Sequence, residues 1–189
     1  ALQAPIDPVT ASALYIAIAT DCGCFRYSNT TPDTLRAAAE LMELGADTQS
    51  INREFFEVKT RARLALESYL ADGLRLFGGG KIGICRLPEQ EKLRLGVTED
   101  DADSIAGFAR NLEGVQIGVM LRDLSPTSCK ISLRTDDRYF DASAICRLLG
   151  GGGHSAAAGA TVPGTLQSGQ AAILQAIHTA TGLPIQEDA

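Results

Sequence analysis

The sequence has no tryptophan and few other aromatic residues, so its core must be built mainly from Ala, Leu and Ile. Aromatic residues make up 5% and apolar residues 45% of the 189 positions, a balance typical of a globular chain rather than a disordered one. No apolar run approaches the length of a bilayer-spanning helix, and no signal-peptide pattern opens the chain. We therefore expect one ordinary domain or two small ones, without a membrane partner.

Positive charge and paired cysteines are also scarce. The formal net charge is −6, which argues against a broad basic surface for long nucleic acid but leaves room for a local pocket that binds a small phosphorylated ligand. The five cysteines are an odd number, which favours free thiols in a reducing cytoplasm over a disulfide framework. Cys22 and Cys24 have no partner pair at zinc-site spacing, which disfavours a zinc site. We therefore expect a cytoplasmic protein.

The first part of the chain predicts helices. Asp7 and Pro8 form an N-cap and a first-turn proline, and the residues 9–19 that follow are apolar on nearly every side. Such a helix has to be buried on most sides, so we expect it to lie inside a larger body. It also leaves a homodimer open, because an uncovered apolar helix can drive association of two copies. A second helix is predicted between Thr31 and Gly45.

A long third helix is predicted to connect two bodies. It begins near Asp47, and apolar residues follow at helical spacing as far as Gly73. This divides the chain into residues 1–50, a connector helix over 51–76 and a second body over 77–189. Strands are expected at 81–87, 115–121, 129–133 and 160–162, and helices at 98–111, 141–149 and 165–181. This order predicts an α/β fold in which helices pack on a mixed sheet.

Four consecutive glycines, Gly150–Gly153, stand directly before His154. Glycine allows positive φ or close approach of a ligand, and successive free N–H groups can converge on an anion. The imidazole of His154 can donate to a phosphate oxygen or assist proton transfer. A flexible turn beside an incidental histidine explains the same pattern, so both interpretations stay open at this point. The other histidine, His178, falls within an amphipathic helix and is expected to be structural.

Two further residues are candidates for a functional site. Asp21 follows the apolar helix directly and precedes Gly23, a placement that suits either a ligand of a hard metal or a helix N-cap. Arg134 lies near the end of a predicted strand, where a guanidinium either binds phosphate bidentately or lies at a solvated rim. The residue types alone leave both alternatives open for each.

Taken together, these segments resemble the DHH phosphoesterases with their DHH-associated C-terminal domain. The likeness is to the bacterial branch of nanoRNases and 3′,5′-bisphosphate nucleotide phosphatases. That family's last metal-binding motif, Asp-Thr-Gly-x-Phe-Arg followed by Asn-Thr-Thr, is matched by Asp21–Arg26 and Asn29–Thr31, with Cys22 in place of the usual Thr. Its C-terminal signature, Ser-Leu-Arg and then Gly-Gly-Gly-His-x-x-Ala-Ala-Gly, is matched by Ser132–Arg134 and Gly151–Gly159. The resemblance runs over nearly the whole chain.

The resemblance implies a metal-dependent phosphoesterase. It implies Mn²⁺ or Mg²⁺ in the full-length enzyme and short oligonucleotides or phosphorylated nucleotides as substrates. It assigns Asp21 as a metal ligand and catalytic residue, and His154 as a catalytic and substrate-binding residue. Arg134, Gly151–Gly153 and, at the cleft wall, Arg26 are the other implied substrate contacts. Residues 1–50 then correspond to the C-terminal remnant of the DHH catalytic domain, and 77–189 to the DHH-associated substrate-binding domain.

One departure from the family pattern limits what this chain can do alone. It has no Asp-His-His triplet, and a single carboxylate cannot hold a metal pair. We therefore expect the remaining ligands upstream in a longer protein, and this chain alone to hold no metal and to be inactive.

Three other functions stay open. The first is a nucleic-acid-binding module without hydrolysis, like the similar C-terminal domain of alanyl-tRNA synthetases. The second is a phosphohydrolase acting on cyclic-dinucleotide products or polyphosphate. The third is a structural fragment whose glycine loop is only a turn.

Overall fold

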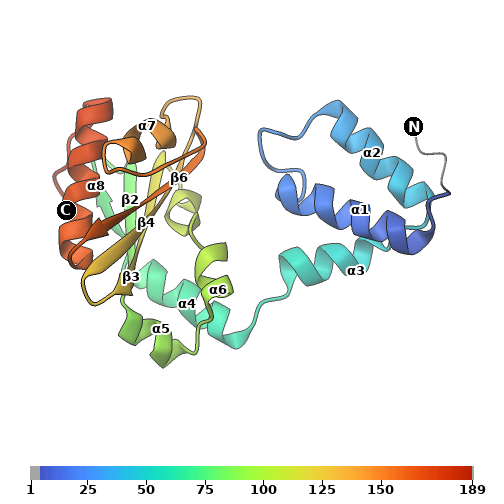
Figure 1. The fold of residues 1–189 in the computed structure, drawn as a ribbon, viewed down its shortest axis with the longest axis horizontal. Coiled ribbons are helices and arrows are strands. Elements are labelled where there is room, and N and C mark those ends of the chain that lie inside the picture. The colour runs from blue at the N-terminus through green and yellow to red at the C-terminus, as the bar shows by residue number, and fades with distance from the viewer. Residues whose placement is uncertain (1–4, 189) are drawn as a thin grey trace. The chain divides into compact units, whose positions relative to one another are not determined.

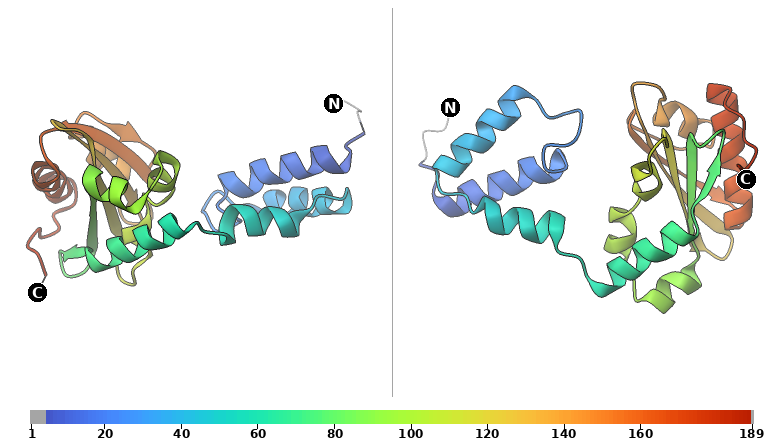
Figure 2. Two further views of the ribbon diagram at one scale, coloured as in Figure 1. Left: turned by 90° about the horizontal axis from the view of Figure 1, so that it is seen from below. Right: turned by 180° about the vertical axis from the view of Figure 1, so that it is seen from behind.

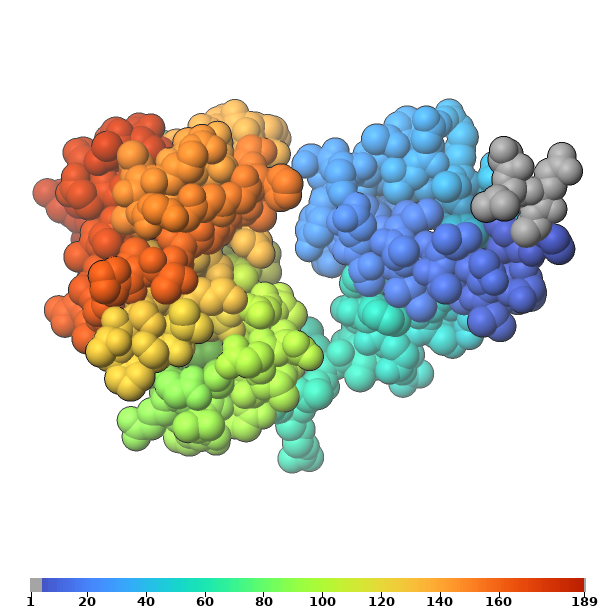
Figure 3. All heavy atoms as spheres, in the orientation of Figure 1, coloured from blue at the N-terminus to red at the C-terminus, as the bar shows by residue number. Residues whose placement is uncertain are grey.

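The computed structural model describes residues 5–188, which belong to two units, Ala1–Lys59 and Thr60–Ala189 (Figures 1 and 3). The first unit is helical, and the second is a mixed sheet covered by helices. The predicted α/β fold class is therefore confirmed. None of the described helices is both long enough and apolar enough to cross a membrane.

The first unit packs three helices around a small core. The helices are α1 (Pro8–Asp21), α2 (Pro32–Glu43) and α3 (Thr48–Asn52), followed by a π-helical turn (Arg53–Glu57). As predicted, Asp7 caps α1, and its carboxylate accepts from the N–H of Thr10 at 2.7 Å. Within the described residues α1 is covered on one face only. Ala11, Tyr15 and Ala19 are buried, whereas 78% of Val9 is exposed, so the expected burial on most sides is not met there.

The prediction of a continuous connector helix over 51–76 is wrong. The π-helical turn ends in Val58, whose ψ of 128° is extended, and helix α4 (Arg61–Asp72) starts anew. Thr60 begins α4, because its hydroxyl accepts from the N–H of Arg63 at 3.0 Å as an N-cap. The break coincides with the boundary between the two units.

The second unit is built on a six-stranded sheet in the order β1-β2-β3-β4-β6-β5. Strands β2 and β3 are parallel, and every other neighbouring pair is antiparallel. The strands are β1 (Arg75–Phe77), β2 (Ile82–Leu87), β3 (Ile117–Ser125), β4 (Ser128–Thr135), β5 (Gly152–Gly153) and β6 (Ala157–Pro163). The remaining helices are α5 (Glu89–Leu95), α6 (Glu99–Ser104), a 3₁₀ turn (Phe108–Asn111), α7 (Ala142–Arg147) and α8 (Leu166–Thr181).

The two faces of this sheet carry two separate apolar cores. On one face, Ile84, Val119 and Leu133 pack with α7 and α8. On the other face, Cys85 and Met120 pack with residues of α4 and α6. Figures 1 and 2 show α8 on one side of the sheet and α4–α6 on the other. Because side chains alternate along a strand, these cores fix which residues of each strand face which side.

The secondary structure of the second unit differs from the prediction at one divided helix and at three short elements. The helix expected over 98–111 is α6 followed by a separate 3₁₀ turn, with Gly107 between them. The short elements β1, α5 and β5 were not predicted. The strands expected at 81–87, 115–121, 129–133 and 160–162 and the helices expected at 141–149 and 165–181 correspond to β2, β3, β4, β6, α7 and α8.

Candidate functional site

Arg134 and His154 lie on the same face of the sheet, on the two sides of strand β6. Arg134 of β4 pairs with Ala157 of β6. Ala157 in turn exchanges two backbone hydrogen bonds with His154, of 2.8 and 3.2 Å. Residues directly opposite each other across strands place their side chains on the same face. The guanidinium and the imidazole therefore flank the methyl group of Ala157, on backbone positions about 10 Å apart.

A second row on this face lacks large side chains. Ser132 of β4 pairs with Gly159 of β6, which pairs with Gly152 of β5. The two rows together form a flat surface, which we call the Arg134–His154 platform. Its members are Arg134, Ala157, His154, Ser132, Gly159 and Gly152. His154 is exposed and Arg134 is half-buried, whereas only 8% of Ser132 is exposed. On this face the apolar core under α4–α6 includes residues of β2 and β3, not of β4, β5 or β6.

The amides of the glycine loop are largely used within the protein. The N–H of Gly150 donates to Arg147 O at 3.1 Å and that of Gly151 to Cys146 O at 2.9 Å, which ends helix α7. The N–H of His154 donates to Ala157. The prediction of free amides ahead of the imidazole is therefore wrong at Gly150 and Gly151, because the N–H groups of these two residues donate to the last carbonyl groups of α7. That Gly151–Gly153 contact a substrate stays a prediction.

Three of the four glycines are explained by the fold, and one is not. Gly150 and Gly153 have φ of 74° and 149°, conformations that favour glycine. A Cβ on Gly151 would lie 2.1 Å from the carbonyl oxygen of Gly159. Gly152 has no positive φ, and a Cβ there would meet nothing within 4 Å. Gly152 is therefore an open position on the platform that a ligand can approach closely.

Next to the platform, Asp136 is held between two arginines. Nε and Nη2 of Arg138 donate to its two carboxylate oxygens at 2.8 and 2.6 Å, and Nη2 of Arg110 lies 3.4 Å away. The hydrogen bonds from Arg138 lower the pKa of Asp136 to about 2. The carboxylate therefore stays ionised beside the two guanidinium groups. The sequence alone does not predict this cluster, because the ion pairs of Asp136 with Arg110 and Arg138 form only in the folded chain.

Asp21 is the last residue of α1, so the alternative in which it caps a helix N-terminus is wrong. Its side chain is exposed, and its Oδ2 accepts from Nδ2 of Asn29 at 2.9 Å. The following residues Gly23, Cys24 and Phe25 have φ of 57°, 55° and 63°. Left-handed conformations at two non-glycine residues are unusual and often occur near functional groups.

Arg26, the proposed residue of the cleft wall, is attached to this loop. Its Nε donates to the carbonyl oxygen of Gly23 at 2.7 Å, and its side chain is exposed. The structure therefore places Asp21 and Arg26 on one loop of the first unit, and Arg134 and His154 on the platform of the second.

Residues 5–188 contain no group of three or more His, Cys, Asp or Glu side chains arranged to hold a metal ion. Asp21 can supply one ligand, with Oδ1 as the oxygen that does not accept from Asn29. Hard cations take six or more oxygen ligands. The donor set of the described residues therefore does not fit a metal centre by itself.

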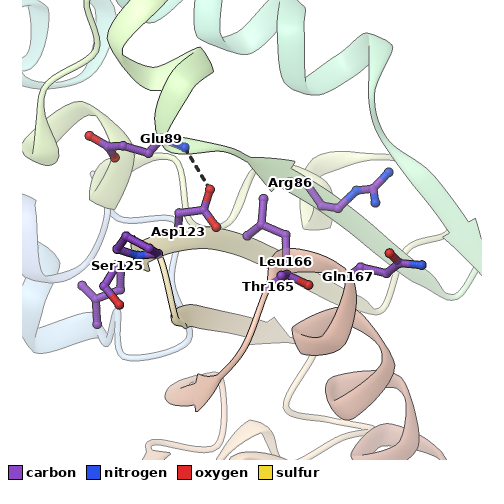
Figure 4. Close-up of a pocket in the computed structure, with 9 residues that line it drawn as sticks. Arg86, Glu89, Asp123, Ser125, Thr165, Leu166 and Gln167 are labelled. Atoms are coloured by element: carbon purple, nitrogen blue, oxygen red, sulfur yellow. Dashed lines mark hydrogen bonds between the residues drawn. The ribbon is translucent and has the colours of Figure 1, made fainter.

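A pocket of about 790 Å³ lies at a different end of the sheet (Figure 4). It is bordered by the last residues of β2 and β3, the β3–β4 turn and the start of α8. The labelled residues are Arg86, Glu89, Asp123, Ser125, Thr165, Leu166 and Gln167. The backbone N–H of Glu89 donates to Asp123 Oδ2 at 3.1 Å. None of the residues that the sequence analysis predicted for a site lines this pocket.

Comparison with known proteins gives one family and several relatives. The family model described as "DHHA1 domain" matches residues 78–181. The "Bifunctional oligoribonuclease and PAP phosphatase NrnA" of Thermus thermophilus is 32% identical over 169 residues, which are 89% of this chain and 50% of that protein. The protein of the same name from Bacillus subtilis is 24% identical, over 83% of this chain and 49% of that protein. The chain thus spans about half the length of the curated relatives it matches.

Among solved structures, an exopolyphosphatase-related protein from Bacteroides fragilis has a TM-score of 0.84 with this chain at 23% identity. The match covers 92% of this chain and 51% of that protein. At this identity the likeness shows the fold and not the activity.

Proposed function

The chain belongs to the DHHA1 domain family, and from this premise we propose that it supplies the phosphate- and nucleotide-binding half of a phosphoesterase. The proposed substrates are short oligonucleotides and 3′,5′-bisphosphate nucleotides. Support comes from relatives whose names state oligoribonuclease and PAP phosphatase activities. The free thiols of all five cysteines agree with a cytoplasmic location, which we propose with it.

The observation that carries the proposal is the row formed by Arg134, Ala157 and His154. The guanidinium is always charged and offers a planar fork of donors that fits phosphate oxygens. The imidazole on the other side of Ala157 can donate to the same phosphoryl group or hold a proton near it. Since the side chain between them is a single methyl group, a phosphoryl group can lie in the space and receive hydrogen bonds from both sides.

Gly152 extends this site. A ligand backbone can approach Gly152 closely because no side chain stands there. A local site of this kind suits short substrates, because it needs no extended basic groove.

We further propose that Asp21 supplies one ligand to a Mn²⁺ or Mg²⁺ centre in the complete protein. Residues 1–50 would then be the last part of the DHH catalytic domain, and the other ligands would come from outside the described residues. Arg26, close to Asp21 in the same segment, is proposed as a further substrate contact. Such a metal supplies activation of water and neutralisation of charge in phosphate ester hydrolysis.

Calorimetric titration with adenosine 3′,5′-bisphosphate tests the binding site. Arg134→Ala and His154→Ala are expected to weaken binding at least tenfold, since each removes a charge-assisted or directed hydrogen bond to phosphate. His178→Ala is the matched control, because His178 lies on α8, on the opposite face of the sheet from the platform, and its Nδ1 contacts Leu183 O. Equal affinities for the parent chain and both platform variants would remove Arg134 and His154 from the site.

A second experiment tests the assignment to a phosphoesterase half. A labelled dinucleotide and Mn²⁺ are added to this chain and to a protein extended at its N-terminus. Turnover only in the longer protein supports the proposal. Turnover by the 189-residue chain would show that the proposed division of the site is wrong.

A further inference from the structure

The loop between β4 and α7 presents an exposed aromatic ring next to a guanidinium. Tyr139 is 61% exposed, and the guanidinium carbon of Arg138 lies 5.5 Å from the centre of its ring. Aromatic rings and guanidinium planes are the surfaces on which proteins stack unpaired nucleobases. Tyr27 and Phe55 of the first unit are also exposed, at 58% and 53%, so the feature that distinguishes Tyr139 is the guanidinium beside its ring.

The loop is held in place by contacts on both sides of Tyr139. Asp136 accepts two side-chain hydrogen bonds from Arg138, and its carboxylate also accepts from the backbone N–H of Arg138 at 3.3 Å. The amides of Tyr139 and Phe140 both donate to Asp136 O at 3.0 Å. Phe140 packs against the core beneath α7 and α8, and Asp141 caps α7. The ring is therefore presented without a large loss of conformational entropy on binding.

This loop starts beside the Arg134–His154 platform and leads to the opposite face of the sheet, where Phe140 packs against the core under α7 and α8. Asp136 follows the last residue of β4, and its N–H donates to Gln116 O at 2.9 Å, which continues the pairing with the β3 side. Its side chain therefore points to the same face as that of Arg134, two residues earlier and about 7 Å away along the chain. Arg110 confirms this direction, because it comes from the 3₁₀ turn on that face and its Nη2 lies 3.4 Å from Asp136. Chain contacts thus lead from the platform through Asp136 to Arg138 and Tyr139.

We propose that Arg138 and Tyr139 form a stacking site for the second nucleobase of a short oligonucleotide whose phosphate lies on the platform. This inference rests on the proposed function and adds to it a site that favours two or more bases over one. Because every nucleobase has a flat face, the site is expected to tolerate base identity. A 3′,5′-bisphosphate nucleotide has a single base and gains less from it.

The test compares the affinities of one-base and two-base ligands. Calorimetry measures binding of adenosine 3′,5′-bisphosphate and of a 5′-phosphorylated diadenylate to the parent chain, Tyr139→Ala, Tyr139→Leu and Tyr139→Phe. The two non-aromatic variants are expected to lower the affinity for the diadenylate about tenfold relative to that for the bisphosphate. Tyr139→Phe keeps the ring and is expected to keep the parent ratio. Leu124→Ala, which shortens another exposed side chain at 60% exposure on β3, is the matched control.

A second readout reports stacking directly. A diadenylate with 2-aminopurine at its second position is expected to lose fluorescence on binding to the parent and to Tyr139→Phe, but not to Tyr139→Ala. If Tyr139→Ala and Tyr139→Leu keep the parent affinity ratio and the fluorescence quenching, the proposed stacking site is wrong, but the proposed phosphate site on the platform is not affected. If the parent chain binds neither ligand, the stacking site and the proposed function both fail.

Discussion

Ala157 lies between Arg134 and His154 in one row across the sheet, paired with Arg134 in register and joined to His154 by two backbone hydrogen bonds. A charged group and a titratable group are thus directed to one space by the backbone of three strands. The floor of that space is a methyl group. Its size, rather than any charge, decides whether a phosphoryl group can lie between the two side chains.

Replacing Ala157 with leucine is expected to block the platform without unfolding the chain. The added side chain occupies the space between Arg134 and His154, and Ala157 is only half-buried, so solvent-facing atoms have room. We expect affinity for adenosine 3′,5′-bisphosphate to fall at least tenfold in calorimetry, with a change in unfolding free energy below about 1 kcal/mol. Ala157→Ser, which adds one oxygen atom, is the matched control. An unchanged affinity of Ala157→Leu for adenosine 3′,5′-bisphosphate would show that the ligand does not bind between Arg134 and His154.

Two neighbouring glycines are expected to respond differently to alanine. Gly151→Ala forces a Cβ to 2.1 Å from Gly159 O, and such overpacking costs about 1–3 kcal/mol or more. Gly152→Ala meets no atom within 4 Å, so stability should stay equal or rise by about 0.4–1 kcal/mol because the unfolded chain loses freedom. Affinity for the bisphosphate should nevertheless fall. Urea unfolding and calorimetry separate the two effects, and unchanged affinity of a stable Gly152→Ala chain would remove Gly152 from the ligand site.

Local signals in the sequence predicted the elements that carry their own start and stop residues. Asp7 with Pro8 marks the start of α1, and Thr165 and Gly182 mark the ends of α8. The prediction of one continuous connector helix was wrong because apolar residues continue at helical spacing on both sides of Thr60. In the structure the hydroxyl of Thr60 caps a new helix there. Strands β1 and β5 have three and two residues. They are strands only because β2 and β6 pair with them, and such pairing is not encoded locally.

The candidate site shows the same limit. Arg134 and His154 could be chosen from their residue types and neighbours, but their common row depends on the register between strands far apart in sequence. The amides of Gly150 and Gly151 were expected to be free, since nothing in the glycine run shows that carbonyls of α7 accept from them. Asp136 with its arginines was missed because its ion pairs form only in the folded chain.

Asp136 is expected to contribute to stability in a pH-dependent way. Hydrogen bonds from Arg138 lower its pKa to about 2 in the folded chain, below the ordinary value that it regains on unfolding. Its contribution is therefore fully present above about pH 4 and is lost as pH falls towards 2. Asp136→Asn should be less stable than the parent at pH 6, and the two unfolding free energies should converge near pH 2. Parallel curves from urea titrations between pH 6 and pH 2 would contradict this linkage.

The C-terminal segment is held against the edge strand β1. The backbone of Glu187 forms an isolated antiparallel β-bridge with Phe77. The carboxylate of Asp188 accepts from the amides of Gly79 and Gly80 at 3.0 and 2.7 Å. Three successive glycines, Gly78–Gly80, have φ between 66° and 79°, so consecutive N–H groups can turn towards one anion.

Removing this carboxylate is expected to loosen the edge of the sheet. Asp188→Ala leaves two amides without their charged acceptor, which should lower the unfolding free energy by about 1 kcal/mol, because water replaces part of the interaction. Asp188→Asn keeps one acceptor oxygen and should have a smaller effect. Hydrogen exchange of the Gly79 and Gly80 amides should accelerate in both variants, and urea unfolding gives the energies. Glu113→Ala, at another exposed position, is the control. Unchanged exchange in Asp188→Ala would show that the Gly78–Gly80 turn does not hold the C-terminal segment.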